Sequence, residues 1–293
     1  MGGKHIVASG AAALALAASP GAPRADDAAL ALASQPFSLG EVSVQRTAGT
    51  ALRLGQFDCN GCFEVPDRFT IVAWDLAATV PLADSAAVFV LQPILFRHGG
   101  GSARGSHRFP GALTVGARHV GAAGPELALA AAVSVSFAYP GGGEAQATAG
   151  AAGRLIDDSS LYSSELSTFR IELDARWRSS PLFAQAQLAL AAHGSEDSLL
   201  GSGRAGLGAG VELAERAALL AELTLQLGIG EITCDHCSPG QPSEGPGRPV
   251  LSIGGRVALT DAWALGARGL LPLTEVDGQE RSPSLSVTAD ARF

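Results

Sequence analysis

The ten residues Phe169–Arg178 alternate strictly between apolar and charged side chains. They read F-R-I-E-L-D-A-R-W-R, with every odd-numbered residue apolar and every even-numbered residue charged. A period of two places the two sets on opposite faces of a β-strand, whereas a helix would spread the charges around its whole circumference. The stretch therefore predicts a strand with one apolar and one charged face. The charged face would meet solvent in a soluble sandwich and the lumen in a membrane barrel.

Similar alternation recurs from residue 41 to the end of the chain and predicts about twelve strands of roughly ten to fourteen residues, near the length of a tilted membrane strand. The first strand is expected at 41–57. Long polar loops, including those expected at 99–110 and 194–203, alternate strictly with short turns. This order of connections is typical of a meander with all its short turns at one end. The expected fold class is all-β, a transmembrane antiparallel up-and-down β-barrel.

The N-terminus has the pattern of a secretory signal peptide. A short polar start precedes the apolar run Ile6–Ala18, and small residues ending at Ala25 could supply a cleavage site. Export would carry the mature chain into an oxidising compartment. The predicted organisation is a signal peptide at 1–25, an N-terminal leader at 26–40 and an outer-membrane β-barrel at 41–293.

Composition excludes two classes of protein. The formal charge of −8 gives no electrostatic support for a nucleic-acid partner. Beyond the N-terminus, no run of about 18 strongly apolar residues appears, so the chain does not read as a helical membrane protein. Strands remain the only predicted means of crossing a membrane.

Strand parity predicts which charged side chains face the lumen of such a barrel. They are Asp75, Arg118, Arg170, Glu172, Asp174, Arg176, Arg178, Glu212, Glu222, Arg256, Arg268, Asp290 and Arg292. These charges could line a polar channel for small solutes, or they could form a salt-bridged plug. The near balance of signs favours the plug, since a selective pore carries an excess of one sign. Twelve strands lie between filled and open barrels, so both alternatives stay open.

Two Cys-x-x-Cys motifs are the sharpest local features of the chain. Cys59 and Cys62 fall in one expected loop, and Cys234 and Cys237 fall in another. Both loops belong to the long set, which places the four cysteines at the same end of the barrel. Disulfide bonds, within each motif or between the loops, are the expected state in an oxidising compartment. The alternative is a four-cysteine zinc or iron site.

The last strand, S-L-S-V-T-A-D-A-R-F, alternates and ends in Phe293. It resembles the C-terminal signal of bacterial outer-membrane β-barrel proteins, a family that includes porins and transporters. The resemblance implies that this strand closes the barrel against the first strand and that the barrel-assembly machinery reads Phe293. It also implies a Gram-negative cell outer membrane, with its lipid as surroundings. The chain departs from the family in its low aromatic content of 5%.

The histidines do not suggest an enzyme. His98, His107 and His119 lie on or near one expected loop and His193 on another, so we expect them at loops or rims. A twelve-stranded outer-membrane phospholipase would need a paired Ser and His on the lipid-facing wall. His119 has outward parity, and no serine is paired with it by register.

The predicted function is a porin-like channel or transporter for small solutes, without enzymatic activity. No cofactor is expected other than the possible zinc or iron at the cysteines. The alternative function is a closed barrel whose cysteine-bearing extracellular loops bind a partner or a metal.

Overall fold

The structure, a computed structural model, describes residues 41–44, 47–59, 67–99, 106–137, 167–194, 199–214, 216–229, 248–273 and 283–292. Every regular element in these ranges is a β-strand, and none of the described residues forms a helix long and apolar enough to cross a membrane. The predicted signal peptide and leader, residues 1–40, lie outside the described ranges.

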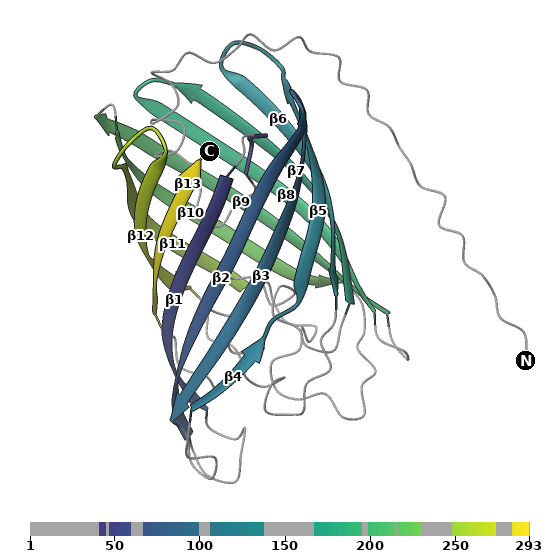
Figure 1. Cartoon of the computed structure of the whole chain (residues 1–293), viewed down its shortest axis with the longest axis vertical. Coiled ribbons are helices and arrows are strands. Elements are labelled where there is room, and N and C mark those ends of the chain that lie inside the picture. The colour runs from purple at the N-terminus through teal and green to yellow at the C-terminus, as the bar shows by residue number, and fades with distance from the viewer. Residues whose placement is uncertain are drawn as a thin grey trace, which may run out of the picture.

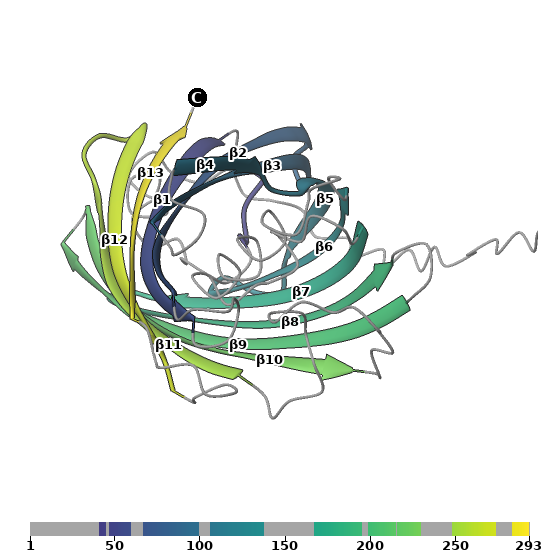
Figure 2. The same cartoon turned by 90° about the horizontal axis from the view of Figure 1, so that it is seen from below.

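The strands run antiparallel and close into a barrel (Figures 1 and 2). They are β1 Thr47–Cys59, β2 Asp67–Ala83, β3 Ala86–Gly99, β4 Ser106–Pro110, β5 Leu113–Ala122, β6 Leu127–Phe137, β7 Ser167–Ser179, β8 Leu182–Gly194, β9 Leu199–Ala214, β10 Ala217–Ile229, β11 Arg248–Ala258, β12 Trp263–Pro272 and β13 Ser284–Arg292. Apart from β4 and β5, which both pair with β3, each strand pairs with its neighbours in the chain, and β1 closes the ring by pairing with β13 from Thr47↔Arg292 to Gly55↔Ser284. Closure removes the exposed sheet edges that would otherwise need partners.

β4 and β5 together occupy one place in the barrel wall, so the closed ring has twelve strands. β5 pairs with the first half of β3 and β4 with its second half. The interruption lies at Pro93, which has no backbone N–H to donate. Gly111 donates to the Pro93 carbonyl at 2.9 Å, and a Cβ on Gly111 would lie 2.8 Å from the Pro93 Cβ. The predicted twelve-stranded barrel is confirmed, but the loop expected at 99–110 is wrong in its second half, which is β4.

Two other predicted boundaries are wrong. β9 begins at Leu199, inside the loop expected at 194–203, because its first residues continue the pairing with β8 even though residues 201–203 are Gly, Ser and Gly. The first strand begins at Thr47 rather than at residue 41. Glu41–Val44 are not part of a strand, and they lie inside the ring of strands (Figure 2).

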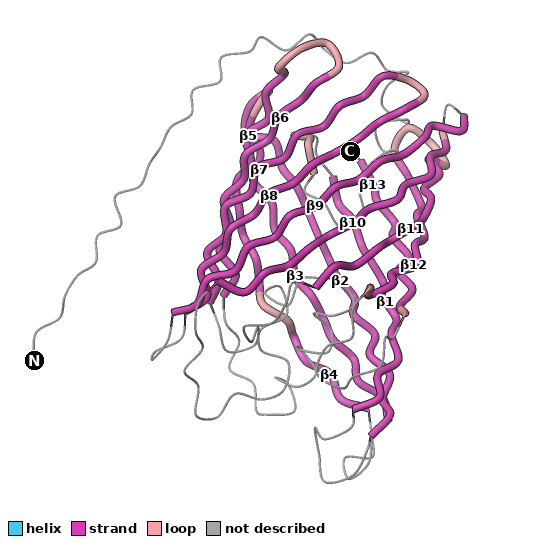
Figure 3. Tube along the Cα trace, turned by 180° about the vertical axis from the view of Figure 1, so that it is seen from behind, coloured by secondary structure: helices cyan, strands magenta, loops and turns pink. Residues whose placement is uncertain are grey.

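The outer surface of the barrel is apolar. On β7 the side chains of Phe169, Ile171 and Leu173 are 45–56% exposed, while Arg170 and Asp174 between them are buried. The same division holds along β12, where exposed and buried residues alternate from Trp263 onward. A continuous coat of exposed Leu, Val and Ile around a closed ring suits lipid and not water. The strands cross this surface at a marked tilt (Figure 3).

Candidate functional site: the charged barrel lumen

The charged residues predicted from parity lie on the inner side of the wall. None of the thirteen is exposed, and Asp75, Glu222 and Arg268 are at most 4% exposed. The residues of opposite parity on the same strands supply the apolar outer surface. Alternation along each strand is enough to sort them, because successive side chains point to opposite faces.

Sequence reasoning missed three arginines on the same inner face. Arg53 follows a break in the alternation, Arg97 ends a mostly apolar strand, and Arg204 lies in a glycine-rich run. Arg97 is 2% exposed and Arg53 forms an ion pair with Asp75. Added to the seven predicted arginines, these three make ten arginines against six carboxylates on the described part of the wall. The two signs are therefore less balanced than parity predicted.

One group of charges, here called the Arg268 cluster, belongs entirely to the wall of β9–β13, β1 and β2. It comprises Arg53, Asp75, Arg204, Glu222, Arg256, Arg268 and Asp290. Arg268 Nη1 lies 3.5 Å from Glu222 Oε2, and both side chains are 1% exposed. Ser252 also donates to Glu222, at 3.2 Å. Arg53 pairs with Asp75, and Arg256 pairs with Asp290.

Glycines on neighbouring strands make room for two members of the Arg268 cluster. A Cβ on Gly254 would lie 2.4 Å from the Ala267 carbonyl oxygen and 2.5 Å from the Arg268 Cβ. A Cβ on Gly49 would lie 2.6 Å from Asp290 Oδ1. At Gly254 the near atoms are a backbone oxygen and a Cβ, which cannot move aside, so Arg268 depends on this glycine; at Gly49 the near atom is the end of the Asp290 side chain, which can shift.

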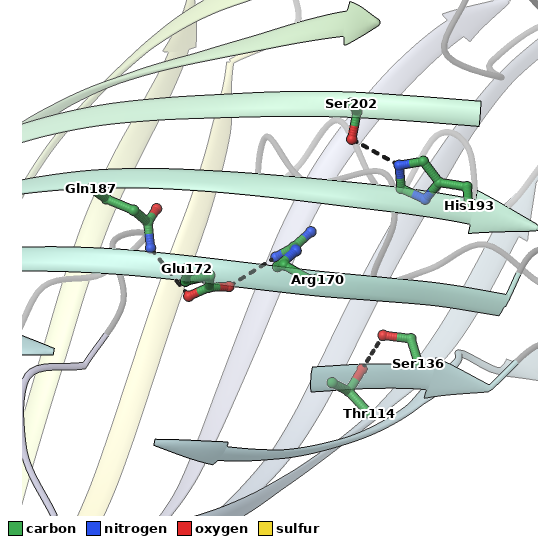
Figure 4. Close-up of polar contacts among 7 residues, drawn as sticks. All are labelled: Thr114, Ser136, Arg170, Glu172, Gln187, His193 and Ser202. Carbon is green, nitrogen blue, oxygen red and sulfur yellow. Dashed lines mark hydrogen bonds and ion pairs between the residues drawn. The ribbon is translucent and has the colours of Figure 1, made fainter. Parts of the chain in front are cut away.

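A second group, the Arg118 cluster, lies on the wall of β5–β9. Its wall members are Arg118, Arg170, Glu172, Asp174, Arg176, Arg178 and Glu212. Arg178 Nε on β7 donates to Glu212 Oε1 on β9 at 2.8 Å. Arg170 lies 3.4 Å from Glu172 on the same strand (Figure 4). Gln187 donates to Glu172, also at 3.4 Å.

Two arginines of this cluster lie over phenylalanine rings that point inward. Phe89 fills the space above Gly116, where a Cβ would lie 2.3 Å from the ring, and the Arg118 guanidinium carbon is 5.1 Å from the ring centre. Phe183 fills the space above Gly210 in the same way, with Arg176 at 5.8 Å from its centre. Each arginine is thus oriented by an aromatic face as well as by its charged neighbours.

Glu41, which lies in the lumen and belongs to no strand, completes the Arg118 cluster. Arg118 Nη1 donates to Glu41 Oε2 at 2.8 Å and to the Ser43 carbonyl oxygen at 3.1 Å. The Ser43 hydroxyl donates to the other carboxylate oxygen at 3.0 Å, and Val42 is buried. The sequence placed this segment in a strand, so it gave no sign of a carboxylate inside the lumen.

Further along the same wall, hydrogen bonds between uncharged side chains join β7, β8 and β9. The Thr168 hydroxyl lies 2.9 Å from His193 Nδ1. The Ser202 hydroxyl lies 2.7 Å from His193 Nε2, and Figure 4 shows this second contact. All three side chains are buried. His193 is the second-last residue of β8, at the end of the strand rather than in a loop, and its burial among polar partners was not predicted. A neutral imidazole suits both contacts, with one nitrogen donating and the other accepting.

The other predicted histidines lie apart. His98 is exposed and contacts Ser106, while His119 lies on the outer face of β5. The side chain of His107 is not among those the structure describes.

The predicted cysteine site and assembly signal fall mostly outside the described residues. Cys59 is the last residue of β1, and nothing is described of its side chain. Cys62, Cys234, Cys237 and Phe293 lie outside the described ranges. Among the described residues, no group of three or more His, Cys, Asp or Glu could hold a metal ion. A disulfide or metal at the cysteines stays a prediction.

The sequence matches no family model and no curated protein. Comparison of structures does find likenesses. An outer membrane channel from Pseudomonas putida F1 is 14% identical, with a TM-score of 0.64 over 88% of this chain and 99% of that one. The NanC porin is 6% identical, with a TM-score of 0.50 over 85% of this chain and 100% of that one.

LpxR from Salmonella typhimurium is 10% identical over 84% of this chain and 100% of that one, with a TM-score of 0.47. Identities this low speak for the fold and not for an activity. The chain has the β-barrel fold of outer-membrane channels.

Proposed function

We propose that the protein is a passive outer-membrane channel for small solutes and that it passes anions more readily than cations. The observation that carries the proposal is the excess of arginine in the lumen, where the described wall carries ten arginines against six carboxylates and Glu41 adds a seventh. A ring of one sign lowers the barrier for counter-ions inside a narrow pore. The chain as a whole is anionic, so the preference is a property of the lumen and not of the protein's net charge.

A passive role fits the lumen better than catalysis does. Ser202 and His193 are in contact, as a nucleophile and a base would be, but they are 6% and 3% exposed. A reacting group needs room beside the nucleophile and an aligned set of donors for the developing charge. The contacts of His193 instead join three adjacent strands, which is a structural role.

A planar lipid bilayer tests the proposal. The purified barrel, inserted under a gradient of KCl, should give discrete conductance steps and a reversal potential of the sign that chloride preference produces. Replacing the wall arginine Arg204 by Gln should move the reversal potential toward zero. A barrel that inserts but never conducts would exclude the channel and favour the closed alternative. A barrel that prefers potassium would overturn the anion preference alone.

The same proposal includes the partners implied by the C-terminal signal. Phe293 would be read by the barrel-assembly machinery, and the apolar coat would contact outer-membrane lipid. Deleting Phe293 should lower the amount of folded protein in the outer membrane, scored by heat-modifiable migration on a gel. Unchanged assembly would argue against the signal.

The cysteines are proposed to form disulfides in the mature protein. Thiol titration of the folded, unreduced protein should find no reactive thiols, and metal analysis should find no zinc or iron. Stoichiometric metal would support the four-cysteine site. Free thiols without metal would exclude both forms.

A further inference from the structure

We propose that Arg118 is a binding site for the carboxylate group of a small solute, and that Glu41 occupies this site as a competitor built into the chain. The inference rests on the proposed function, because a carboxylate solute reaches Arg118 only through the lumen. It goes further in naming a ligand class and a residue that controls access to it.

The geometry around Arg118 is that of a carboxylate site. Its guanidinium donates to a carboxylate oxygen at 2.8 Å, and the second oxygen of that carboxylate accepts from the Ser43 hydroxyl at 3.0 Å. A single guanidinium nitrogen, Nη1, makes the contact, and a hydrogen bond in which both partners are charged is stronger than a neutral one. The occupant here is not a wall residue. It comes from Glu41–Val44, which precedes the first strand.

The site is fixed without Glu41. Arg118 extends from β5, which is held on both sides by ladders to β3 and β6. The Phe89 ring lies beside the guanidinium, and that ring is seated above Gly116. A donor held by its own wall is available to any carboxylate that reaches it, since little ordering remains to be done on binding.

Charge balance points to an acid as the ligand. The wall of the Arg118 cluster carries four arginines (Arg118, Arg170, Arg176 and Arg178) against three carboxylates (Glu172, Asp174 and Glu212). Glu41 makes the numbers equal. Without Glu41 the cluster holds one uncompensated positive charge in a partly buried place, which an anion would neutralise.

A tethered competitor weakens the apparent affinity for a free ligand. A short tether presents its group at an effective concentration in the millimolar range, comparable to the dissociation constant of a single carboxylate site. We therefore expect Glu41→Gln to bind a carboxylate about threefold to tenfold more tightly than the unaltered protein. Gln keeps the size of Glu41 and removes its charge.

Thermal unfolding in detergent tests binding without requiring conduction. Sodium acetate is the probe, titrated against sodium chloride at constant ionic strength, for the unaltered protein, Glu41→Gln and Glu41→Gln with Arg118→Gln. Acetate should raise the unfolding midpoint of Glu41→Gln at lower concentrations than it does for the unaltered protein, because ligand that binds only the folded state stabilises it. The double variant should show no specific response. Asp261→Asn removes an exposed acid at a turn and should behave as the unaltered protein.

A second measurement covers the case in which Glu41→Gln does not fold, as judged by heat-modifiable migration. Arg118→Gln in the unaltered chain removes the charged donor, so it should abolish the acetate response of the unaltered protein. Equal acetate responses in all of the folded variants would overturn the inference, and so would a response that survives Arg118→Gln. An acetate response in a barrel that does not conduct would keep the site and reject the channel.

Discussion

The two charge clusters of the lumen pair their arginines with carboxylates by different routes. In the Arg268 cluster, the three ion pairs described above each join one wall strand to another, and the Arg268–Glu222 pair is almost completely buried. The wall of each cluster carries four arginines against three carboxylates, but only in the Arg118 cluster does the segment before β1 add a fourth carboxylate in the contacts described here. The first arrangement is part of the folded wall. The second can be undone without breaking a strand pairing, which is why the site we propose belongs there.

The largest expected effect comes from making the same substitution in both clusters. Glu222→Gln should destabilise the barrel by about 3–5 kcal/mol, since it leaves Arg268 buried without its carboxylate partner. Glu41→Gln should cost about 1 kcal/mol or less, because Glu41 is half-buried and the strands stay intact. Urea unfolding in micelles, followed by tryptophan fluorescence, measures both. Equal losses would remove the distinction between the clusters.

The glycine beside Arg268 gives the next effect. Gly254→Ala should destabilise by about 1–3 kcal/mol, because the new methyl group meets a backbone oxygen that cannot move aside. Gly269→Ala on the next strand is the matched control, since its Cβ would have no atom within 4 Å. The same unfolding assay compares them. A neutral Gly254→Ala would mean that the arginine does not depend on the flat wall beside it.

The hydrogen bonds of His193 test whether buried polar contacts near the Arg118 cluster also stabilise the barrel. Ser202→Ala should cost about 1–2 kcal/mol, because a buried ring nitrogen loses its partner. Replacing Thr114 and Ser136 together by Val and Ala should cost less, because both members of their 2.8 Å contact become apolar at once. A larger loss of unfolding free energy for the double change than for Ser202→Ala would contradict this account of the His193 contacts.

The smallest effect is expected outside the lumen. Arg216 and Asp261 form an ion pair at 2.9 Å with side chains 49% and 67% exposed. Asp261→Asn should change the free energy of unfolding by about 0.5 kcal/mol or less, and salt should remove even that. A loss of unfolding free energy as large as that of Glu222→Gln would show that the stability contributed by these ion pairs does not depend on their burial.

Much of the fold and part of the site followed from local pattern. In a closed membrane barrel, a run such as Phe169–Arg178 can place only its apolar face toward lipid and its charged face toward the lumen. Parity therefore selected thirteen wall charges, all of which are shielded from solvent. It missed Arg53 and Arg204, because the alternation near them is interrupted by glycine or a change of phase. Pro93 lay inside a predicted strand, but the sequence did not show that the partner strand would split opposite it.

The sequence by itself determined the strands, their faces and the alternating lengths of their connections, because these depend on side chains a few residues apart. Only the tertiary structure decided which charges meet. Arg268 reaches Glu222 two strands away, and Arg118 reaches Glu41 from 77 residues along the chain. These partners depend on the stagger between strands and on where the segment before β1 lies. Periodicity carries no record of either, since a strand has the same two faces whatever stands across the lumen.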